Sequence, residues 1–177
     1  GFAIGAAMAR LVEPGMTVFV DAGSTTLACA ARLTAAATVV THAPAIAAAL
    51  VENPAVRLVT LGGQIDREVG AATGAAVLAA IATIRPDLLL LGACGVDAEA
   101  GITAHSPEDA VVKRALAAQA GRVAVAADRA KLGTAAPFAV ADLAAIDVML
   151  IEAATPPETR ARLAACGPRL VEVETGA

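Results

Sequence analysis

Short apolar runs typical of β-strands alternate with alanine-rich helical patterns along this chain. The continuous apolar run from Leu88 to Leu91 is typical of a strand buried on both faces of a parallel sheet. Runs of this kind predict strands at residues 17–20, 38–41, 56–61, 87–91, 123–126, 148–151 and 170–173. The patterns between them predict helices at residues 4–12, 25–33, 44–51, 74–83, 107–120 and 157–165. This order predicts an α/β fold, mainly a parallel sheet with helices on both faces and right-handed crossovers.

Composition indicates how such a fold is packed. The chain has 177 residues, of which 58% are hydrophobic and only 17% are charged, and this excludes a disordered chain. Because it contains no Trp and no Tyr, its core must consist of Val, Leu, Ile and small residues, with helices packed close to the sheet. We find no internal repeat and no linker, and we therefore expect residues 1–177 to form a single domain.

Charge and hydropathy exclude two classes of partner. The net charge is −4 and the 13 basic residues are scattered, whereas nucleic-acid binding needs clustered Lys and Arg. The longest segment without charge, residues 33–51, is interrupted by polar residues and a proline, which favours strand, turn and helix over a membrane span. The first residues have no basic flank, and Arg10 and Glu13 interrupt the apolar pattern, so we expect no signal peptide. We therefore expect a cytoplasmic protein that contacts neither membrane nor, by itself, DNA.

The cysteines and histidines indicate no metal site. Cys29, Cys94 and Cys166 are odd in number and lack the spacing of metal ligands, so we expect buried thiols in a reducing compartment. His42 and His105 are too few for a histidine-based site. We expect neither a metal nor a cofactor.

The loop after the first predicted strand is the clearest candidate for ligand binding. It begins with Asp21 and continues through Gly23, Ser24, Thr25 and Thr26 into a helical pattern. A strand that turns into a helix in this way leaves backbone N–H groups free, and these groups favour a phosphate. Gly23 permits close approach of the backbone, and the hydroxyl groups add donors. The alternative is an ordinary turn with a Ser or Thr cap.

Small, polar or charged residues follow the other predicted strands as well. The carboxyl ends of parallel strands lie on one edge of a sheet, where ligands of α/β proteins bind. We therefore expect these segments to form one pocket for a polar small molecule: Thr41-His42-Ala43, Gly62-Gly63-Gln64, residues 92–97 including Gly95 and Asp97, and residues 128–131 from Asp128 to Lys131.

In this order, the motifs resemble the C-terminal effector-sensing domain of DeoR-type transcriptional regulators. The resemblance continues through Gly101-Ile102-Thr103, through Glu108 with Lys113, and through residues 127–133, and so covers nearly the whole chain. It implies a fold like that of ribose-5-phosphate isomerase and coenzyme-A transferases, and a phosphorylated sugar or related metabolite as effector. It also implies a preceding winged helix-turn-helix domain, and for a sensor of this kind we expect a homo-oligomer. We expect that domain to be absent from this chain, so that DNA is bound only through it.

One residue departs from the family pattern. The family usually has Asn after the Thr of the second strand, where this chain has His42 after Thr41. An imidazole in this place changes the hydrogen bonds available to a sugar hydroxyl, or adds a pH-dependent donor.

A phosphate and a sugar make different demands on the residues of such a site. We expect the phosphate to bind backbone N–H groups from Gly23 to Thr26, the hydroxyls of Ser24 and Thr25, and the ammonium of Lys131, a point charge without fixed geometry. The alternative for Lys131 is a solvated surface charge.

Sugar hydroxyls need acceptors, and Asp21, Asp97 and Asp128 are the natural choices. Asp97 also fits a plain turn, and Asp128 also fits a cap of the turn after it. Gly62 and Gly63 either let the backbone approach the ligand or form a tight turn.

The segment around the fifth predicted helix supplies three further candidates. Glu108 is favoured at a helix N-terminus, and Lys113 reaches back from the same helix toward the pocket. The alternative is a helix that presents both to solvent. His105 lies in a loop able to close over a ligand.

Two enzyme classes compete with a sensor. An aldose–ketose isomerase needs a carboxylate base, but ungapped counting from the isomerase-like pair Asp128 and Lys131 puts Lys113 at the place of the catalytic glutamate. A lysine of ordinary pKa is protonated at neutral pH and cannot be that base. An acyl or coenzyme-A transferase would need a clear catalytic glutamate in a strand-end loop. We therefore expect a sensor without catalytic activity, in which ligand binding changes the packing between subunits.

Overall fold

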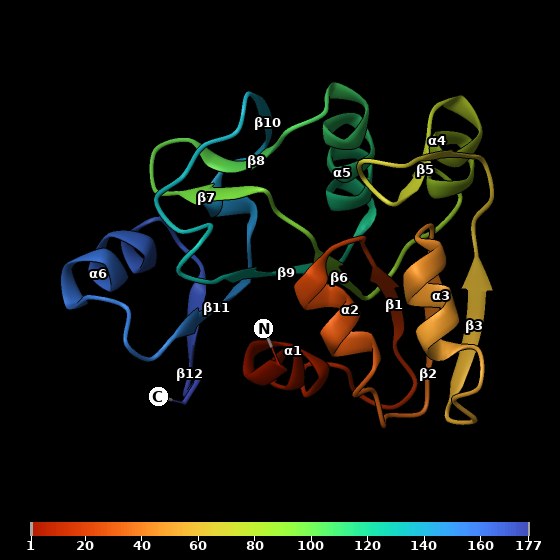
Figure 1. Ribbon diagram of the computed structural model, residues 1–177, viewed down its shortest axis with the longest axis horizontal. Helices are drawn as coiled ribbons and strands as arrows, with labels where there is room; N and C mark the ends of the chain where they lie inside the picture. The colour runs from red at the N-terminus through yellow and green to blue at the C-terminus, as the bar shows by residue number, and fades with distance from the viewer. Residues whose placement is uncertain (1, 177) are drawn as a thin grey trace.

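A seven-stranded sheet, entirely parallel, forms the centre of the molecule (Figure 1). The computed structural model describes residues 2–176. The strand order is β12-β11-β9-β6-β1-β2-β3. Its strands are β1 (Thr17–Val20), β2 (Ala37–Thr41), β3 (Val56–Thr60), β6 (Leu88–Leu91), β9 (Arg122–Ala127), β11 (Val148–Glu152) and β12 (Arg169–Val173).

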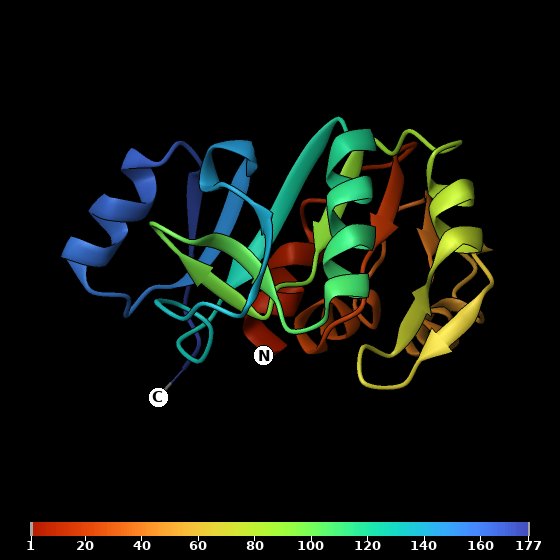
Figure 2. The same ribbon diagram turned by 90° about the horizontal axis from the view of Figure 1, so that it is seen from above.

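Helices cover both faces of this sheet (Figure 2). One face packs against α1 (Phe2–Ala9), α2 (Ser24–Ala30) and α3 (Pro44–Leu50), and the other against α4 (Ala75–Ile81), α5 (Pro107–Gln119) and α6 (Pro157–Ala165). In β6 the leucines alternate, with Leu88 and Leu90 in the first core and Leu89 and Leu91 in the second. The fold predicted from the alternating pattern is therefore confirmed.

Every strand and helix predicted from the pattern is present, with ends that differ by at most a few residues. The pattern missed two small sheets and a short 3₁₀ helix. A hairpin pairs β4 with β5, and a three-stranded antiparallel sheet has the order β10-β8-β7. The missed elements are β4 (Gln64–Asp66), β5 (Ala71–Thr73), β7 (Gly95–Asp97), β8 (Gly101–Ala104), β10 (Phe138–Ala141) and η1 (Leu143–Ala145). β4, β5, β7 and η1 span only three residues each, which is too short to show a hydrophobic period, so turn chemistry dominates their sequences.

The strands β1 and β6 lie side by side at the middle of the sheet, where the direction of the chain reverses. From β1 the chain proceeds outward to β2 and β3, and from β6 it proceeds outward to β9, β11 and β12. The loops after these two strands therefore leave in opposite directions, and the crevice between them is the general ligand position of open α/β sheets.

Helix α5 is held at several points along its length. Ser106 Oγ accepts the backbone N–H of Asp109 at 3.3 Å and so caps its first turn. Arg114 Nη1 donates to the carbonyl of Ala139 in β10 at 2.5 Å. At the far end, the Gln119 side-chain amide donates to three carbonyls at the end of α4, those of Ile81, Ala82 and Ile84, at 3.2, 2.9 and 3.0 Å.

Candidate functional site

Asp21 is the centre of a buried network at the crevice between β1 and β6. Its Oδ1 accepts the backbone N–H of Ala22 at 2.9 Å and faces His42 Nε2 at 3.0 Å. Its Oδ2 accepts the backbone N–H of Gly92 at 2.9 Å and the Lys113 ammonium at 2.5 Å. The side chain is fully buried, and four partners occupy its acceptor sites. Asp21 thus joins the ends of β1, β2 and β6 to α5, and a ligand hydroxyl would have to displace one of these donors.

The charges in this network stabilise each other. Burial opposes ionisation of Asp21, but the charge of Lys113 and the hydrogen bond from His42 hold its pKa far below the ordinary value. Burial also disfavours the Lys113 ammonium, yet the carboxylates of Asp21 and Asp109 raise its pKa above the usual value. Asp21 and Lys113 are therefore a carboxylate and an ammonium at neutral pH.

His42 bridges two acceptors. Its Nδ1 lies 3.0 Å from the carbonyl oxygen of Ala72, and its Nε2 lies 3.0 Å from Asp21 Oδ1. Both partners can only accept, so both hydrogen bonds form together when each ring nitrogen carries a proton. The ring is buried and packs at a tilt on Phe19, with centroids 5.5 Å apart. His42 thus contacts Asp21 and the β5 backbone.

Asp109, which was not among the predicted site residues, is the residue of α5 that joins this cluster. Its Oδ2 lies 3.5 Å from Lys113 Nζ, and its Oδ1 is buried without a hydrogen-bond partner among the described residues. Burial raises its pKa above the ordinary value, although Lys113 offsets part of the effect. The neighbour chosen from sequence, Glu108, is exposed. Spacing would have found Asp109, since it lies four residues before Lys113 and therefore on the same face of the helix.

Two adjoining cavities lie at the crevice. The first, named here the α5 cavity, has a volume of about 170 Å³. The second, named here the Lys131 cavity, has a volume of about 10 Å³. Gly23, Gly92 and Ala93 line both, so only backbone and one methyl group separate them. The α5 cavity is further lined by Ala22, Glu68, Val69, Cys94, His105, Ser106, Asp109 and Lys113, and the Lys131 cavity by Met8, Thr25, Thr26, Leu91, Ala126 and Lys131.

The loop from Gly23 into α2 has less capping than its sequence suggests. No side chain caps the helix at Gly23, and the Thr26 hydroxyl donates to the Gly23 carbonyl at 3.0 Å. Thr25 and Thr26 are buried and line the Lys131 cavity, whereas Ser24 is exposed and lies outside it. Lys131 is half-buried and forms no ion pair with residues 2–176.

Several other residues selected from the strand ends lie outside both cavities. Thr41 is buried, and its hydroxyl donates to the Val20 carbonyl at 2.7 Å. Gly62 and Gly63 line neither cavity, although a Cβ at Gly63 would lie 3.3 Å from the Ala72 methyl group.

Gly95 also has a packing role. A Cβ at this position would lie 2.6 Å from the carbonyl oxygen of Thr134, so a side chain would clash with the loop after β9. The Asp128 carboxylate accepts the backbone N–H of Lys131 at 3.1 Å, which is the capping role that the sequence left open. Asp128 lines neither cavity.

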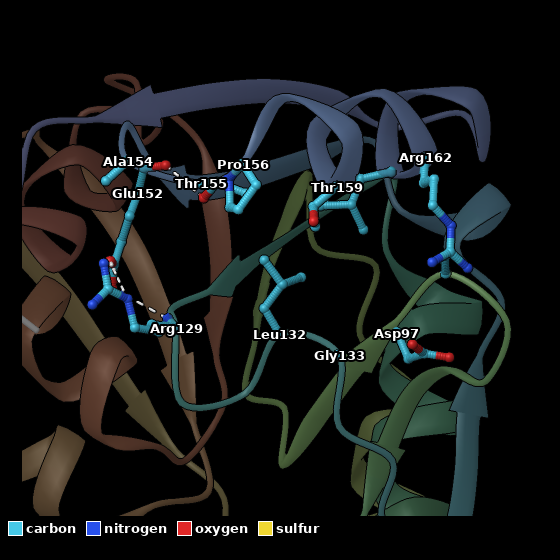
Figure 3. A pocket seen from close by; sticks show the side chains of 12 residues that line it. Asp97, Arg129, Leu132, Gly133, Glu152, Ala154, Thr155, Pro156, Thr159 and Arg162 are labelled. Atoms are coloured by element: carbon cyan, nitrogen blue, oxygen red, sulfur yellow. Dashed lines mark hydrogen bonds and ion pairs between the residues drawn. The ribbon is translucent and has the colours of Figure 1, made fainter.

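Asp97 lies in a different pocket of about 420 Å³, between the β9, β11 and α6 segments (Figure 3). Its carboxylate accepts the backbone N–H groups of Glu99 and Ala100 at 3.0 and 2.9 Å, and these bonds lower its pKa. In Figure 3, Arg162 points toward Asp97 from α6, and Arg129 points toward Glu152 at the other end of the pocket. Asp97 is therefore separate from the two adjoining cavities.

The part of the chain that the structure describes, residues 2–176, shows neither a metal-binding cluster nor a membrane-spanning helix. No group of three or more His, Cys, Asp or Glu side chains gathers there in a way that could hold a metal ion. Within the same range, no helix is long and apolar enough to cross a membrane.

Of the three free cysteines only Cys29 is buried; Cys94 and Cys166 are partly exposed, so the expectation of three buried thiols was wrong for two of them.

The family model and the individual relatives found by sequence comparison agree with each other. The family model described as the DeoR C terminal sensor domain matches residues 2–153. The HTH-type transcriptional repressor GlcR of Bacillus subtilis is 33% identical over 150 residues, which are 84% of this chain and 58% of that protein. The HTH-type transcriptional regulator GlpR of Haloferax volcanii is 30% identical over 94% of this chain and 65% of its own length. The chain thus spans about three fifths of the length of these relatives.

Comparison with solved structures supports the fold. Ribose 5-phosphate isomerase A from Neisseria gonorrhoeae matches with a TM-score of 0.52 and 14% identity, over 73% of this chain and 51% of that chain. The eIF2B beta subunit from Chaetomium thermophilum matches with a TM-score of 0.52 and 15% identity, over 82% of this chain and 46% of that chain. At such identities the likeness concerns the fold alone. Because the family match covers most of the chain, the protein belongs to the family of DeoR C-terminal sensor domains.

Proposed function

We propose that this domain binds a phosphorylated sugar or a related metabolite across the two adjoining cavities, as a sensor and not as an enzyme. The observation that carries the proposal is the shared wall of Gly23, Gly92 and Ala93. On one side of it lies an ammonium without an ion partner among residues 2–176, that of Lys131, and on the other lies a buried carboxylate–ammonium cluster. One small ligand with an anionic end and a polar uncharged end fits this division.

The Lys131 side is the proposed phosphate end. Lys131 supplies a positive charge, and Thr25 and Thr26 lie in the same wall. The cavity of about 10 Å³ has room for about one water. The phosphate therefore lies at its mouth, and the flexible Lys131 side chain swings outward to contact it.

The α5 side is the proposed sugar end. Its volume of about 170 Å³ exceeds that of several waters and suits a short carbon chain with hydroxyl groups. Lys113, Asp109, His105 and Ser106 line this side and offer both donors and acceptors.

The chemistry of Lys113 argues against an isomerase. Ungapped counting from Asp128 and Lys131 puts Lys113 where an aldose–ketose isomerase has its carboxylate base, and an ammonium with a raised pKa accepts no proton at neutral pH. The relatives are transcriptional repressors and regulators by name. A sensor needs only a ligand that binds one conformation better than another.

The whole protein then acts as a DeoR-type repressor in the cytoplasm. In this proposal the chain is a single sensing domain, ligand binding alters the packing between subunits of a homo-oligomer, and the change reaches a helix-turn-helix DNA-binding domain. Two relatives are named HTH-type transcriptional repressor and HTH-type transcriptional regulator, and these names support the assignment.

Titration calorimetry with ribose 5-phosphate, ribose and inorganic phosphate tests the proposal. Lys131→Ala and Thr25→Ala should weaken binding of ribose 5-phosphate far more than binding of ribose. Arg129→Ala, at an exposed neighbouring position, should have little effect on either affinity. Equal losses for ribose 5-phosphate and ribose would contradict the phosphate end. An isomerised product, detected by NMR of the recovered ligand, would contradict the sensor.

A further inference from the structure

We propose that Asp109 and Lys113 together select a hydroxyl group on the ligand, which donates to Asp109 and accepts from Lys113. This inference rests on the proposed function, because it concerns the end of the ligand that is remote from the phosphate. It assigns the α5 cavity a chemical preference for a hydroxyl over an amine, a carboxylate or a plain hydrocarbon.

The first observation is the unsatisfied acceptor of Asp109. This residue is only 4% exposed, and its Oδ1 has no hydrogen-bond partner among the described residues. A buried acceptor without a partner destabilises a protein, so such groups in native structures call for a partner. Asp109 lines the α5 cavity, and rotation about its Cβ–Cγ bond presents an oxygen to that space without movement of the backbone.

The second observation is the incomplete use of Lys113. An ammonium has three N–H donors. Asp21 takes one at 2.5 Å, and the contact with Asp109 at 3.5 Å is too long for a strong hydrogen bond. Lys113 lines the same cavity as Asp109, one helical turn away. The two side chains therefore offer a donor and an acceptor to the same small volume.

The charges of the surrounding groups determine which ligand group fits. A carboxylate or phosphate on the ligand would be repelled by Asp21 and Asp109. An ammonium would pair with Asp109, but it would be repelled by Lys113 and would leave the free donors of Lys113 without an acceptor. A methylene would leave both Asp109 and Lys113 unsatisfied. A hydroxyl is neutral and is both donor and acceptor, so among these groups it alone satisfies both Asp109 and Lys113.

Binding measurements with Asp109→Ala and Asp109→Asn test this assignment, with the exposed neighbour Glu108→Ala as the matched control. The ligands are ribose 5-phosphate, its hydroxyl-free counterpart pentyl phosphate, 5-aminopentyl phosphate and inorganic phosphate. The wild type should prefer ribose 5-phosphate over pentyl phosphate by about tenfold or more. Asp109→Ala should lose most of that preference by weakening the binding of ribose 5-phosphate alone. Asp109→Asn, which keeps a carbonyl acceptor, should lose less, and Glu108→Ala should keep the preference.

Thermal unfolding without ligand separates this role from a purely structural one. Removing an unsatisfied buried carboxylate should leave the Tm of Asp109→Ala at or above that of the wild type. A clear fall in Tm, with the ligand preference unchanged, would overturn the inference and make Asp109 a structural partner of Lys113. Tighter binding of 5-aminopentyl phosphate than of ribose 5-phosphate would also overturn it.

Lys131→Ala distinguishes the two proposals. If Lys131→Ala weakens binding of all four compounds while Asp109→Ala changes the affinity for none of them, the assignment of the phosphate end stands and the hydroxyl assignment fails. If the wild type binds none of the four compounds, the proposed function fails and the inference fails with it.

Discussion

Asp21 and Lys113 are 92 positions apart in the sequence, and their charged atoms lie 2.5 Å apart. Both side chains are buried, and the contact joins the end of β1 to the middle of α5. Each is the principal counter-charge of the other, because the only other carboxylate near Lys113, among the residues that the structure describes, lies 3.5 Å away. The first prediction follows from this mutual dependence.

Asp21→Asn should destabilise the domain by about 3–5 kcal/mol, because it leaves a buried ammonium without its main partner. Urea unfolding followed by circular dichroism measures the change. The exposed carboxylate variant Glu108→Gln, on the same helix as Lys113, should stay within about 0.5 kcal/mol of the wild type. Equal stability of Asp21→Asn and Glu108→Gln would show that the buried pair contributes nothing.

The stability of the domain should fall as the pH drops below about 4. The pKa of Asp21 is lowered in the folded state, so the unfolded state binds more protons in acid. Its contribution is complete above the unfolded pKa and is lost as the pH falls toward the folded one. Unfolding free energies from pH 7 to pH 3 check this.

Asp109 should act in the opposite direction. Its pKa is raised in the folded state, so its ionisation opposes folding once the pH rises above the unfolded value. Asp109→Asn should therefore stabilise the free protein at pH 7 and have little effect at pH 3.

In the same pH series, Asp21→Asn should reduce the fall of the unfolding free energy in acid. An unchanged fall would contradict the assignment of this effect to Asp21.

Gly92→Ala should destabilise the domain by about 1–3 kcal/mol and prevent ligand binding. A Cβ at this position would lie 2.1 Å from the Ala22 carbonyl oxygen, so the loops after β1 and β6 would have to separate. Gly62→Ala is the matched control, because a Cβ at Gly62 meets nothing within 4 Å. Thermal unfolding of the two variants compares them directly, and a similar Tm would exclude a close approach at Gly92.

Cys29 should resist alkylation in the native protein. Burial raises the pKa of its thiol to about 12, so almost no thiolate is present near neutral pH. Iodoacetamide at pH 8 should label Cys94 and Cys166, which are partly exposed, well before Cys29. Mass spectrometry of peptides locates the labels, and equal labelling of all three in urea is the control. Rapid native labelling of Cys29 would indicate that the packing between α2 and the sheet opens readily.

The parallel sheet and its helices were predictable because their signals are periodic. Apolar runs such as Leu88 to Leu91, and helical stretches closed by Gly or Pro, are long enough to be recognised locally. The small sheets were not predictable, since β7 and β4 span only three residues each and depend on partners distant in sequence. Gly95 to Asp97 therefore looked like a turn.

The strand-end rule placed Asp21, Gly23 and His42 in one neighbourhood, and the fifth predicted helix added Lys113. The structure brings these residues together or into adjoining walls. It could not say that Asp21 uses all its acceptor sites within the protein, since three of its four partners come from distant segments. The choice of Glu108 over Asp109 has a different cause. Both are acidic residues in the first turn of α5, and the four-residue spacing to Lys113, which puts Asp109 on the same face of the helix, was the signal that distinguishes them.

Helix α5 has consequences beyond the cavity that it lines. At its first turns Asp109 and Lys113 face the α5 cavity, at its middle Arg114 binds the β10 backbone, and at its end Gln119 binds three carbonyls of the α4 terminus. Because this one helix makes all of these contacts, a small rotation of α5 at the cavity would displace both α4 and the three-stranded sheet. An event at one hydroxyl group would thereby reach two separate surfaces of the molecule at once.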